Sequence, residues 1–485
     1  MGEPIPIIDV FILTFNAAKS LINVPIFSKH LYDCFGQRSQ KALPELVVVC
    51  LQEMAPLAKA FIGSYMLSPY FQSYESAINA AAARFISDEE RRLQASPDPP
   101  YTLIKTGNVG MTGIMLFALH PENIHNLQAA EVGFGAGDMA NKGAVGIRLL
   151  YTKENYKAQV KETELTFVST HLAHTEWNLE KRNKNWETIV SGLLFEDPKK
   201  LIRPSAEPTP RHSQDGQESQ PLMDRTLDEQ EKAMQKISVY KPGSHLFVAG
   251  DLNYRISKTA PDSTSKFPVC EPESPYHWRA FLQRDQLRIE QDAKRTMQGL
   301  VEAAINFPPT YKVVCKPTVH SGSTLEDIAV EQDNANDPKW TWAPHRWPSW
   351  CDRVLFTNIP WWAQAPADEH KEMKITVYDA IPPLQTSDHR PVYLRLEVPV
   401  MPPSKLSPSD LAYETELALE RSEPPDPRVK LPYPIDIQSW EHRAYVKKWE
   451  SIIGWSMVIS KSKQGIAVFV TILVLGMGTW WLRSS

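Results

Sequence analysis

Short apolar runs recur between residues 5 and 400, and each of them ends in or begins beside a polar side chain. The runs are rich in Val, Leu, Ile and Phe, and turn-forming residues bound them, which is typical of β-strands. Because strands are rigid and loops shape access to them, the polar residues at the ends of these runs are the first candidates for chemistry. We predict strands at residues 10–15, 46–52, 165–170, 246–250, 354–356 and 392–396.

Five of these strand ends carry oxygen or imidazole chemistry. Each has an ordinary structural explanation, since Asn is common in turns, Glu is solvated at a strand end, and His packs in a core. Five such ends in one chain nevertheless favour one shared site over five independent turns. The residues are Asn16, Glu53, His171, Asp251 with Asn253, and Asp388 with His389.

The pair Asp388-His389 precedes the last predicted strand, and Asp352 lies upstream beside another. An Asp-His pair at a strand start can supply a metal or water contact together with a group that transfers a proton or binds phosphate. A second Asp can fix the tautomer of the His. A Ser-Asp-His tripeptide alone is more often a surface turn, so its place among the other polar strand ends is what favours function.

The domain organisation follows from composition. Residues 1–400 alternate strands with amphipathic helices, such as residues 177–194, and we predict one catalytic domain there. Within it, residues 197–236 are polar and poor in aromatics, which predicts a disordered or weakly helical insertion. The proline-dense residues 401–460 predict a semi-extended linker and then a juxtamembrane segment. The tryptophans near the end of this segment indicate a short helix that either lies on a membrane or packs on the domain.

Residues 465–482 carry no charge, and at about 1.5 Å per residue they are long enough to cross a thin bilayer such as that of the endoplasmic reticulum. Lysines flank this segment on one side, and Trp480 and Trp481 lie at the other. A buried core helix is the alternative. We predict that residues 461–485 form a C-terminal tail anchor, a single transmembrane helix at the endoplasmic reticulum membrane, with the catalytic domain facing the cytosol.

Composition agrees with a cytosolic domain. The five cysteines form no C-x-x-C pair, which suits a reducing compartment better than a disulfide scaffold or a zinc site. The net charge of −5 and the pI near 6.3 provide no global basic footprint for nucleic acid. We expect a monomer without a nucleic-acid partner.

Two longer motifs identify a family. Phe-Val-Ala-Gly-Asp-Leu-Asn-Tyr-Arg at residues 247–255 and Pro-Ser-Trp-Cys-Asp-Arg-Val-Leu at residues 348–355 resemble the two signatures of the inositol polyphosphate 5-phosphatases. These enzymes belong to the endonuclease/exonuclease/phosphatase superfamily. Supporting matches are Leu-Gln-Glu at 51–53, Asn-Lys-Gly-Ala-Val at 141–145, Ser-Thr-His-Leu at 169–172, Phe-Pro-Pro-Thr-Tyr-Lys at 307–312 and the Ser-Asp-His-Arg-Pro run. The resemblance implies a DNase I-like α/β fold, a four-layer α/β/β/α sandwich of two mostly antiparallel sheets.

The resemblance also implies roles. A phosphate monoester needs its charge neutralised and a water aligned with the leaving oxygen, and hard oxygen ligands suit Mg²⁺. Glu53, Asn16 and Asp388 would hold Mg²⁺ or its waters. Asp251 with Asn253 would orient and deprotonate the attacking water. The remaining catalytic positions would be His389, which binds the scissile phosphate, Asp352, which accepts the other ring proton of His389, and His171, which contacts a further phosphate oxygen.

The resemblance also implies which residues bind the substrate, namely Arg and Lys side chains and their neighbours. Arg binds phosphate through two parallel N–H groups, and Lys binds it as a single positive charge. The sequence departs from the family in two places: Phe15 stands where Trp is frequent, and Met139-Ala140 precedes Asn141 where Gly is usual. Neither change removes a polar group. The candidate substrate-binding residues are Asn141, Lys142, Arg255, Tyr311, Lys312 and Arg353.

The resulting hypothesis is a Mg²⁺-dependent phosphatase that removes the 5-phosphate of phosphatidylinositol 4,5-bisphosphate at a cytosol-facing membrane. The chain most resembles the fungal tail-anchored members of the family. One alternative is a phosphodiesterase of the same fold, of nuclease or sphingomyelinase type, and residues 307–312 and 351–353 argue against it. Another is a catalytically silent scaffold that only binds phosphoinositide, and the intact set of polar strand ends argues against that.

Overall fold

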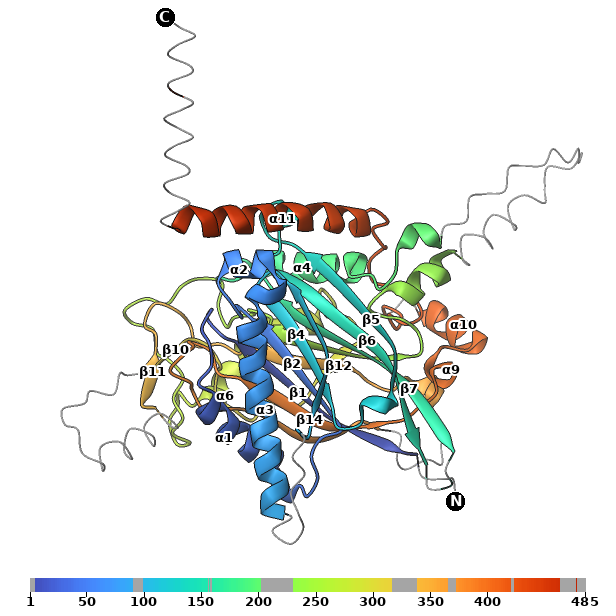
Figure 1. Cartoon of the computed structure of the whole chain (residues 1–485), viewed down its shortest axis with the longest axis horizontal. Helices are drawn as coiled ribbons and strands as arrows, with labels where there is room; N and C mark the ends of the chain where they lie inside the picture. The colour runs from blue at the N-terminus through green and yellow to red at the C-terminus, as the bar shows by residue number, and fades with distance from the viewer. Residues whose placement is uncertain are drawn as a thin grey trace, which may run out of the picture.

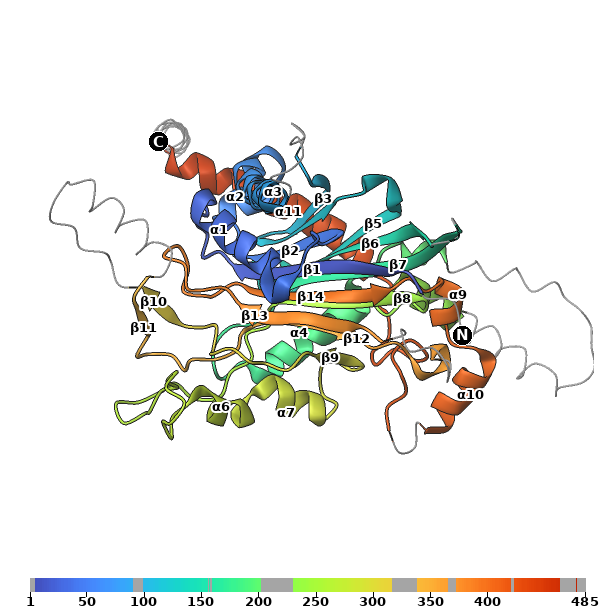
Figure 2. The ribbon, with the colours of Figure 1, turned by 90° about the horizontal axis from the view of Figure 1, so that it is seen from below.

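The structure is a computed structural model that describes residues 5–89, 99–155, 157, 159–201, 230–315, 338–364, 372–419, 423–462 and 477. Two six-stranded sheets pack face to face and helices cover their outer sides (Figures 1 and 2). We call them sheet A and sheet B. A separate short ribbon pairs β10 (Val313–Cys315) with β11 (Trp340–Trp342).

Sheet A has the strand order β13-β14-β1-β2-β4-β3. Its pairs are antiparallel except for β1 and β2, which run parallel. The strands are β1 (Ile7–Asn16), β2 (Leu46–Gln52), β3 (Thr102–Val109), β4 (Thr112–Ala118), β13 (Lys374–Ala380) and β14 (Val392–Pro399).

Sheet B has the order β5-β6-β7-β8-β12-β9, and only β7 and β8 run parallel in it. The strands are β5 (Ile124–Gly133), β6 (Gly143–Glu154), β7 (Val160–His171), β8 (Ser244–Asp251), β9 (Leu300–Glu302) and β12 (Asp352–Thr357). All six strands predicted from the apolar runs are present in the two sheets.

The alternation of side chains along each strand explains the layers. On β1, Val10 and Ile12 point into the core between the sheets, where they meet Phe167 and Phe247 of sheet B. Phe11, Leu13 and Phe15 point outward and pack on helices α1 (Val24–Phe35) and α3 (Ser68–Glu89). Sheet A is therefore buried on both faces, which is why its strands are apolar without a polar side.

Sheet B repeats this arrangement. Val168 and Val248 point away from the inter-sheet core and meet Trp186 and Ile189 of α4 (Leu179–Gly192). Figure 2 shows α1, α2 and α3 on one side of the sheets and α4, α6 and α7 on the other. The predicted four-layer sandwich and the helix expected at residues 177–194 are both confirmed. The further helices here are α2 (Leu57–Ile62), α6 (Trp278–Phe281) and α7 (Gln286–Asp292).

In residues 401–460 the proline-dense part differs from the predicted semi-extended linker, whereas the helix expected around the tryptophans is present and packs on the domain, which is one of its two predicted places. These residues form α9 (Pro403–Leu406), α10 (Asp410–Leu419) and α11 (Ser439–Lys461), and they pack on the catalytic domain. Met401 and Leu406 are buried against Ile359 and Ala363. The reason is tertiary, because prolines end helices without preventing the segments between them from burying apolar side chains.

Two predictions fall mainly on residues that the structure does not describe. Of the insertion at residues 197–236, the structure describes residues 197–201 and 230–236, the latter within a helical stretch. The predicted transmembrane span at residues 465–482 lies outside the described residues apart from residue 477. Among the described helices, none is both long enough and apolar enough to cross a membrane.

Candidate active site

Strand register brings the polar strand ends to one edge of the sandwich. The parallel strands β1 and β2 finish together, with Asn16 opposite Gln52, and Glu53 follows. In the second sheet β7 and β8 also finish together, with His171 opposite Asp251. The antiparallel β12 begins at this same edge, where Asp352 lies opposite Asp251. Because β1 runs parallel to β2, and β7 to β8, their C-terminal ends meet at one edge. Residues that are far apart in sequence are therefore close together there.

A hydrogen bond joins the two sheets at this edge. The side-chain amide of Asn16 donates to Oδ2 of Asp251 over 2.9 Å, and both residues are buried. One step further in, Nε2 of Gln52 donates to the hydroxyl of Ser169 over 3.4 Å. Gln52 and Ser169 are not among the predicted site residues, because both lie within apolar strands. They become neighbours only because the two sheets pack face to face.

Asp251 lies at the centre of the polar cluster. Its Oδ2 is 3.2 Å from Nε2 of His171 and 3.8 Å from Nε2 of His389, and its Oδ1 accepts from the backbone N–H of Asn253 over 3.1 Å. Burial alone would raise the pKa of Asp251, but the nearby His389, His171 and Lys142 outweigh burial and hold it far below the usual value. Asp251 is therefore a buried carboxylate that keeps its charge.

His389 and Asp352 form a second buried pair. Nδ1 of His389 is 2.9 Å from Oδ2 of Asp352, which also accepts from the hydroxyl of Thr310 over 2.7 Å. Although burial disfavours the imidazolium, Asp352 and Asp251 raise the pKa of His389 to about 9. The predicted pairing of Asp352 with Nδ1 of His389 is present, and it stabilises the charged, doubly protonated ring, while Thr310 holds Asp352 in place. Thr310 was missed because a Thr after two prolines gives no signal of its own.

The residues expected to hold a metal supply hard oxygens at the exposed side of the site. Glu53 pairs with Lys19, with 3.0 Å between Oε2 and Nζ. Burial works to raise the pKa of Glu53, but His171 and Lys19 hold it below the usual value, so the side chain is anionic. The same holds for Asp388, whose pKa is lowered against the effect of burial by His389 and Lys312. Oδ1 of Asn16 accepts only a backbone N–H, over 3.1 Å.

A divalent cation fits this donor set. Two charged carboxylates and an amide oxygen are the ligands that Mg²⁺ and Ca²⁺ prefer. Within the described residues, ligand atoms of Asp251, Asp352 and His389 also lie within 4.8 Å of one another, close enough to hold a metal. His389 in its charged form offers no lone pair, so the carboxylates are the stronger part of that triad.

Four of the predicted substrate-binding residues border the catalytic cluster. Nζ of Lys142 contacts Nε2 of His171, and burial lowers the pKa of Lys142 to about 8. The guanidinium of Arg255 lies 4.1 Å from the ring centre of Tyr311, and that ring lies 4.7 Å from the ring of His389. Nζ of Lys312 contacts Oδ2 of Asp388.

Four polar atoms in or beside this cluster are buried without a partner among the described residues, namely Nδ1 of His171, Oδ1 of Asp352, Nη1 of Arg255 and Oδ1 of Asn141. Buried polar groups are normally paired, so each is a candidate contact for a bound ligand. Nη2 of Arg255 meanwhile contacts the side chain of Asn253, whose own amide donates to the carbonyl of Leu172 over 3.2 Å.

The structure corrects the prediction for Arg353. Its side chain leaves β12 on the side opposite Asp352, as alternation along a strand requires. There it makes buried ion pairs with Asp285 over 3.0 Å and with Glu302, and it is 2% exposed. Arg353 therefore stabilises the fold instead of binding substrate. The motif that contains Arg353 lies beside the site, but successive side chains along β12 point to opposite faces. Asp352 therefore faces the site and Arg353 does not.

His174 is a further residue that sequence analysis missed. It is exposed, and its pKa is lowered by partial burial and by the positive charge of Lys142. Its proximity to Lys142 adds an imidazole to the rim of the site. The signal available in the sequence was its position three residues after His171.

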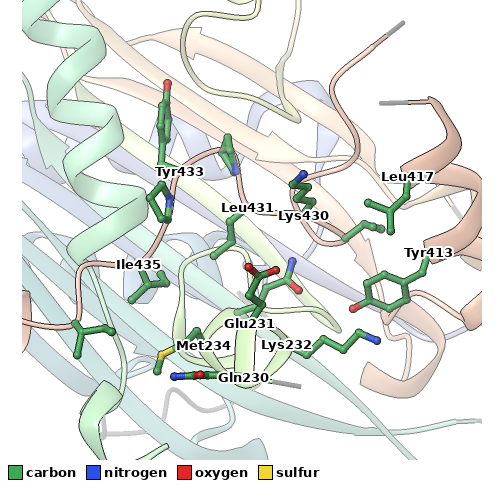
Figure 3. Close-up of a pocket in the computed structure, with 15 residues that line it drawn as sticks. Gln230, Glu231, Lys232, Met234, Tyr413, Leu417, Lys430, Leu431, Tyr433 and Ile435 are labelled. Atoms are coloured by element: carbon green, nitrogen blue, oxygen red, sulfur yellow. The ribbon is translucent and has the colours of Figure 1, made fainter. Parts of the chain in front are cut away.

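A cavity of about 710 Å³ lies away from the catalytic edge (Figure 3). None of the predicted site residues lines it. Its walls come from residues 230–235, α10 and residues 429–437, and they include Met234, Tyr413, Leu417, Leu431 and Ile435. Its lining is mostly apolar, and the charged side chains in it, Glu231, Lys232 and Lys430, do not form an acid, base or metal ligand set comparable with the cluster around Asp251.

Comparisons with known proteins show the family to which the chain is similar. The family model described as endonuclease/exonuclease/phosphatase family 2 matches residues 13–395. The type II inositol 1,4,5-trisphosphate 5-phosphatase of Mus musculus is 28% identical over 302 residues, which cover 61% of this chain and 22% of that protein. The polyphosphatidylinositol phosphatase INP53 of Saccharomyces cerevisiae is 24% identical over 391 residues, 80% of this chain and 26% of that protein.

A solved structure has the same fold. The inositol polyphosphate 5-phosphatase domain of SPsynaptojanin, in complex with inositol (1,4)-bisphosphate and calcium ion, superimposes with a TM-score of 0.51 at 19% identity, covering 93% of this chain and 92% of that chain. The DNase I-like α/β sandwich predicted from the sequence is therefore confirmed. The matched part of the chain spans only 17% to 34% of the length of the curated relatives.

Proposed function

This chain belongs to the endonuclease/exonuclease/phosphatase family 2, and we propose that it hydrolyses the 5-phosphate of phosphatidylinositol 4,5-bisphosphate. The observation that carries the proposal is the charged, buried Asp251, which contacts Asn16 and His171 and lies beside the His389–Asp352 pair. The names of the relatives, all of them inositol polyphosphate or phosphoinositide phosphatases, support the substrate class.

In the proposed reaction, Asp251 orients a water molecule and accepts one of its protons. The oxygen of that water forms a bond to phosphorus, and the bond from phosphorus to the inositol oxygen breaks. The leaving oxygen takes up a proton and departs as the alcohol. Charged His389 neutralises a phosphate oxygen during this step, and its charge is available at neutral pH because its pKa is about 9.

Glu53, Asn16 and Asp388 are the residues that we propose to hold a divalent metal, with Mg²⁺ as the physiological ion. When bound, such an ion supplies Lewis-acid stabilisation of negative charge on phosphate oxygens. Glu53 and Asp388 contribute the anionic oxygens. Their pKa values are lowered, so both carboxylates are ionised at neutral pH. Lys19 and Lys312, which pair with these carboxylates in the structure, would then have to share or release them.

We propose that Asn141, Lys142, Arg255, Tyr311 and Lys312 read the phosphates that are not cleaved. Lys142 borders the site from the side of His171, and Lys312 borders it from the side of Asp388. Two cations on different sides of the reaction centre suit a ring with phosphates at neighbouring positions. Lys312 is our candidate for the 4-phosphate.

Residues 465–482 are proposed to insert into the endoplasmic reticulum membrane as a tail anchor, so that the domain meets its lipid from the cytosolic side. The support is the uncharged stretch itself and its flanking lysines and tryptophans. A fluorescent protein fused to residues 437–485 tests this address. We expect a reticular signal, and a fusion that stays diffuse in the cytosol would contradict the proposal.

Phosphate release, together with analysis of the cleaved products, tests the reaction. The full chain is assayed with phosphatidylinositol 4,5-bisphosphate, soluble inositol polyphosphates, sphingomyelin and DNA, each with Mg²⁺ and with excess chelator. We expect release only from the inositol phosphates and only with metal. Cleavage of a phosphodiester would favour the nuclease or sphingomyelinase alternative, and binding of the lipid without any release would favour a silent scaffold.

A further inference from the structure

Helix α11 has two faces of opposite character. Arg443, Val446, Glu450 and Gly454 are buried, and their spacing of three and four residues places them on one side of the helix. This side is docked on the catalytic domain. Figure 1 shows α11 (red) lying across the top of the domain, over α2 and α4.

The docked face is held by specific contacts. Oε1 of Glu450 accepts from the backbone N–H of Ala140 over 2.6 Å, and Arg443 donates to both carboxylate oxygens of Glu450 over 2.9 and 2.8 Å. At Gly454 the helix comes so close to α2 that a Cβ would lie 2.9 Å from the carbonyl oxygen of Ala58. α11 is therefore a fixed part of the domain surface.

This helix lies at the rim of the catalytic edge. Ala140, which Glu450 binds, directly precedes Asn141 and Lys142, two of the proposed substrate-binding residues. The helix α2, which Gly454 contacts, begins four residues after Glu53. Both elements beneath α11 thus lead directly into the site.

The opposite face of α11 presents a row of large apolar side chains to solvent. The spacing again follows one side of the helix, and the tyrosine and the first tryptophan pack edge to face with ring centres 6.4 Å apart. Proteins that stay in water rarely expose so many large apolar side chains in a continuous row. We call this row the outward stripe, and it consists of Tyr445 (59% exposed), Trp449 (48%), Ile452 (55%), Trp455 (40%) and Ile459 (50%).

The chemistry of the outward stripe matches a lipid surface. Tyr and Trp prefer the boundary between headgroups and acyl chains, and amphipathic helices bind there through an apolar face flanked by cations. Lys448 is exposed beside the stripe and Lys461 is exposed at the end of the helix, and both would meet anionic headgroups. The exposed Glu441, one turn before Tyr445, pairs with Lys199, and the exposed Lys447 pairs with Glu131. The uncharged residues 465–482 follow the helix after only a few residues, so they would hold its end close to the same bilayer.

We propose that α11 is a membrane-docking helix whose outward stripe seats the catalytic domain on an anionic bilayer, with the active-site rim held toward the lipid substrate. The inference rests on the proposed function, since it assumes a substrate that resides in that bilayer. Docking would raise the effective concentration of the active site at the bilayer and restrict its orientation. It would have no effect on a soluble substrate.

Kinetics of the full chain on two substrates tests this proposal. Trp449→Glu/Ile452→Glu places two charges in the outward stripe, and Leu411→Glu/Leu419→Glu places two charges on exposed positions of α10 as a matched control. The proteins are incorporated into vesicles of phosphatidylcholine and phosphatidylserine that contain phosphatidylinositol 4,5-bisphosphate. We expect the α11 variant to lose at least tenfold in kcat/KM on the lipid and to keep its activity on soluble inositol 1,4,5-trisphosphate, while the control keeps both.

A fluorescent probe reports the contact directly and does not depend on the charged variant folding. In the full chain, Cys270→Ser removes the exposed thiol among the described residues, and a cysteine introduced as Ile452→Cys or, for the control, Leu411→Cys carries an environment-sensitive dye. We expect a blue shift with vesicles at position 452, quenching there by lipid-borne quenchers, and neither effect at position 411.

The other outcomes distinguish a failure of the docking inference from a failure of the proposed function. A dye at position 452 that stays in water on vesicles whose lipid is being hydrolysed excludes docking through the stripe, although the proposed function stands. A blue shift that appears without vesicles and grows with protein concentration indicates that the stripe pairs two copies of the chain. Absence of phosphate release from either inositol substrate, with the shift at position 452 retained, contradicts the proposed function and not the docking.

Discussion

At the scale of single residues, the charge of Asp251 depends on neighbours from four strand ends. Asn16 on β1 donates a hydrogen bond to it, and His171 on β7 and His389 in the turn before β14 hold its pKa low. Asp352 at the start of β12 acts indirectly, because it pairs with His389. A carboxylate buried without these partners would be neutral and could not accept a proton from water. Its proposed role as a base therefore depends on the whole cluster.

Asp251→Ala removes the proposed base. We expect kcat to fall by a factor on the order of 10² to 10⁴, because that is the usual contribution of a positioned acid or base. Binding of the lipid headgroup should largely survive, since the proposed phosphate contacts come from Lys142, Arg255 and Lys312. Steady-state kinetics together with headgroup binding measures both effects, and a variant that kept more than a tenth of the wild-type turnover would refute the assignment.

Lys312→Ala tests recognition of the ring. Loss of one charge-assisted contact should weaken transition-state binding by about 1.5–3 kcal/mol. The loss should be larger for an inositide with a 4-phosphate than for one without it, and kcat/KM on the two substrates gives the comparison. Lys312→Arg, which keeps the charge, is the control. Equal losses on both substrates would make Lys312 a general electrostatic residue or a support for Asp388, which it contacts.

At the scale of elements, α11 supports a loop of the active site, a contact that the sequence did not indicate. Its buried Glu450 is the hydrogen-bond acceptor for the loop that carries Asn141 and Lys142, and Arg443 and Lys447 tie the helix to Glu131 on β5. A helix from the end of the chain thus supports a loop from its first third. The position of that loop should then depend on the helix.

Glu450→Ala removes this support. The backbone N–H of Ala140 and the guanidinium of Arg443 would both lose a buried partner, so we expect the loop to loosen and KM for a soluble inositol phosphate to rise about tenfold. Glu450→Gln keeps an acceptor for Ala140 and should have a smaller effect. Lys447→Ala, which removes only an exposed ion pair with Glu131, should leave the kinetics unchanged. An unaltered KM in Glu450→Ala would show that the loop holds its position without α11.

At the scale of the whole molecule, the sandwich buries a neutral imidazole that makes the fold sensitive to acid. His245 on β8 is 1% exposed, and burial lowers its pKa to about 3. In the unfolded chain the pKa of His is about 6.5, so below that pH the unfolded state binds a proton that the folded state excludes. Stability is therefore lost as the pH falls from about 6.5 toward 3, at about 1.4 kcal/mol per pH unit.

His245→Phe keeps a planar ring and removes this titration. We expect the difference in the free energy of unfolding between pH 7 and pH 5 to shrink by about 2 kcal/mol relative to wild type. Urea denaturation at the two pH values measures it. The exposed His120→Gln serves as the control, and an unchanged pH difference in His245→Phe would mean that His245 stays charged or is solvated in the folded state.

The sequence by itself determined the strands and the polar residues that close them. Buried strands need apolar side chains along their length, and a reactive group at a strand end interrupts that pattern, so both are visible locally in residues such as Glu53, His171 and Asp251. The motif around Asp352 likewise predicted its pairing with His389, because a tautomer-fixing carboxylate is a recurring requirement of a working histidine.

Tertiary structure alone decided which neighbours share a face and which distant elements meet. Arg353 stands next to Asp352 in the chain but points to the other side of β12, and Thr310 reaches Asp352 only because two loops meet. Local composition predicted a semi-extended linker for the proline-dense part of residues 401–460, yet α9 and α10 there pack on the domain. The physical reason is that burial and long-range hydrogen bonds depend on which surfaces the fold brings together. A local pattern of side chains does not specify those surfaces.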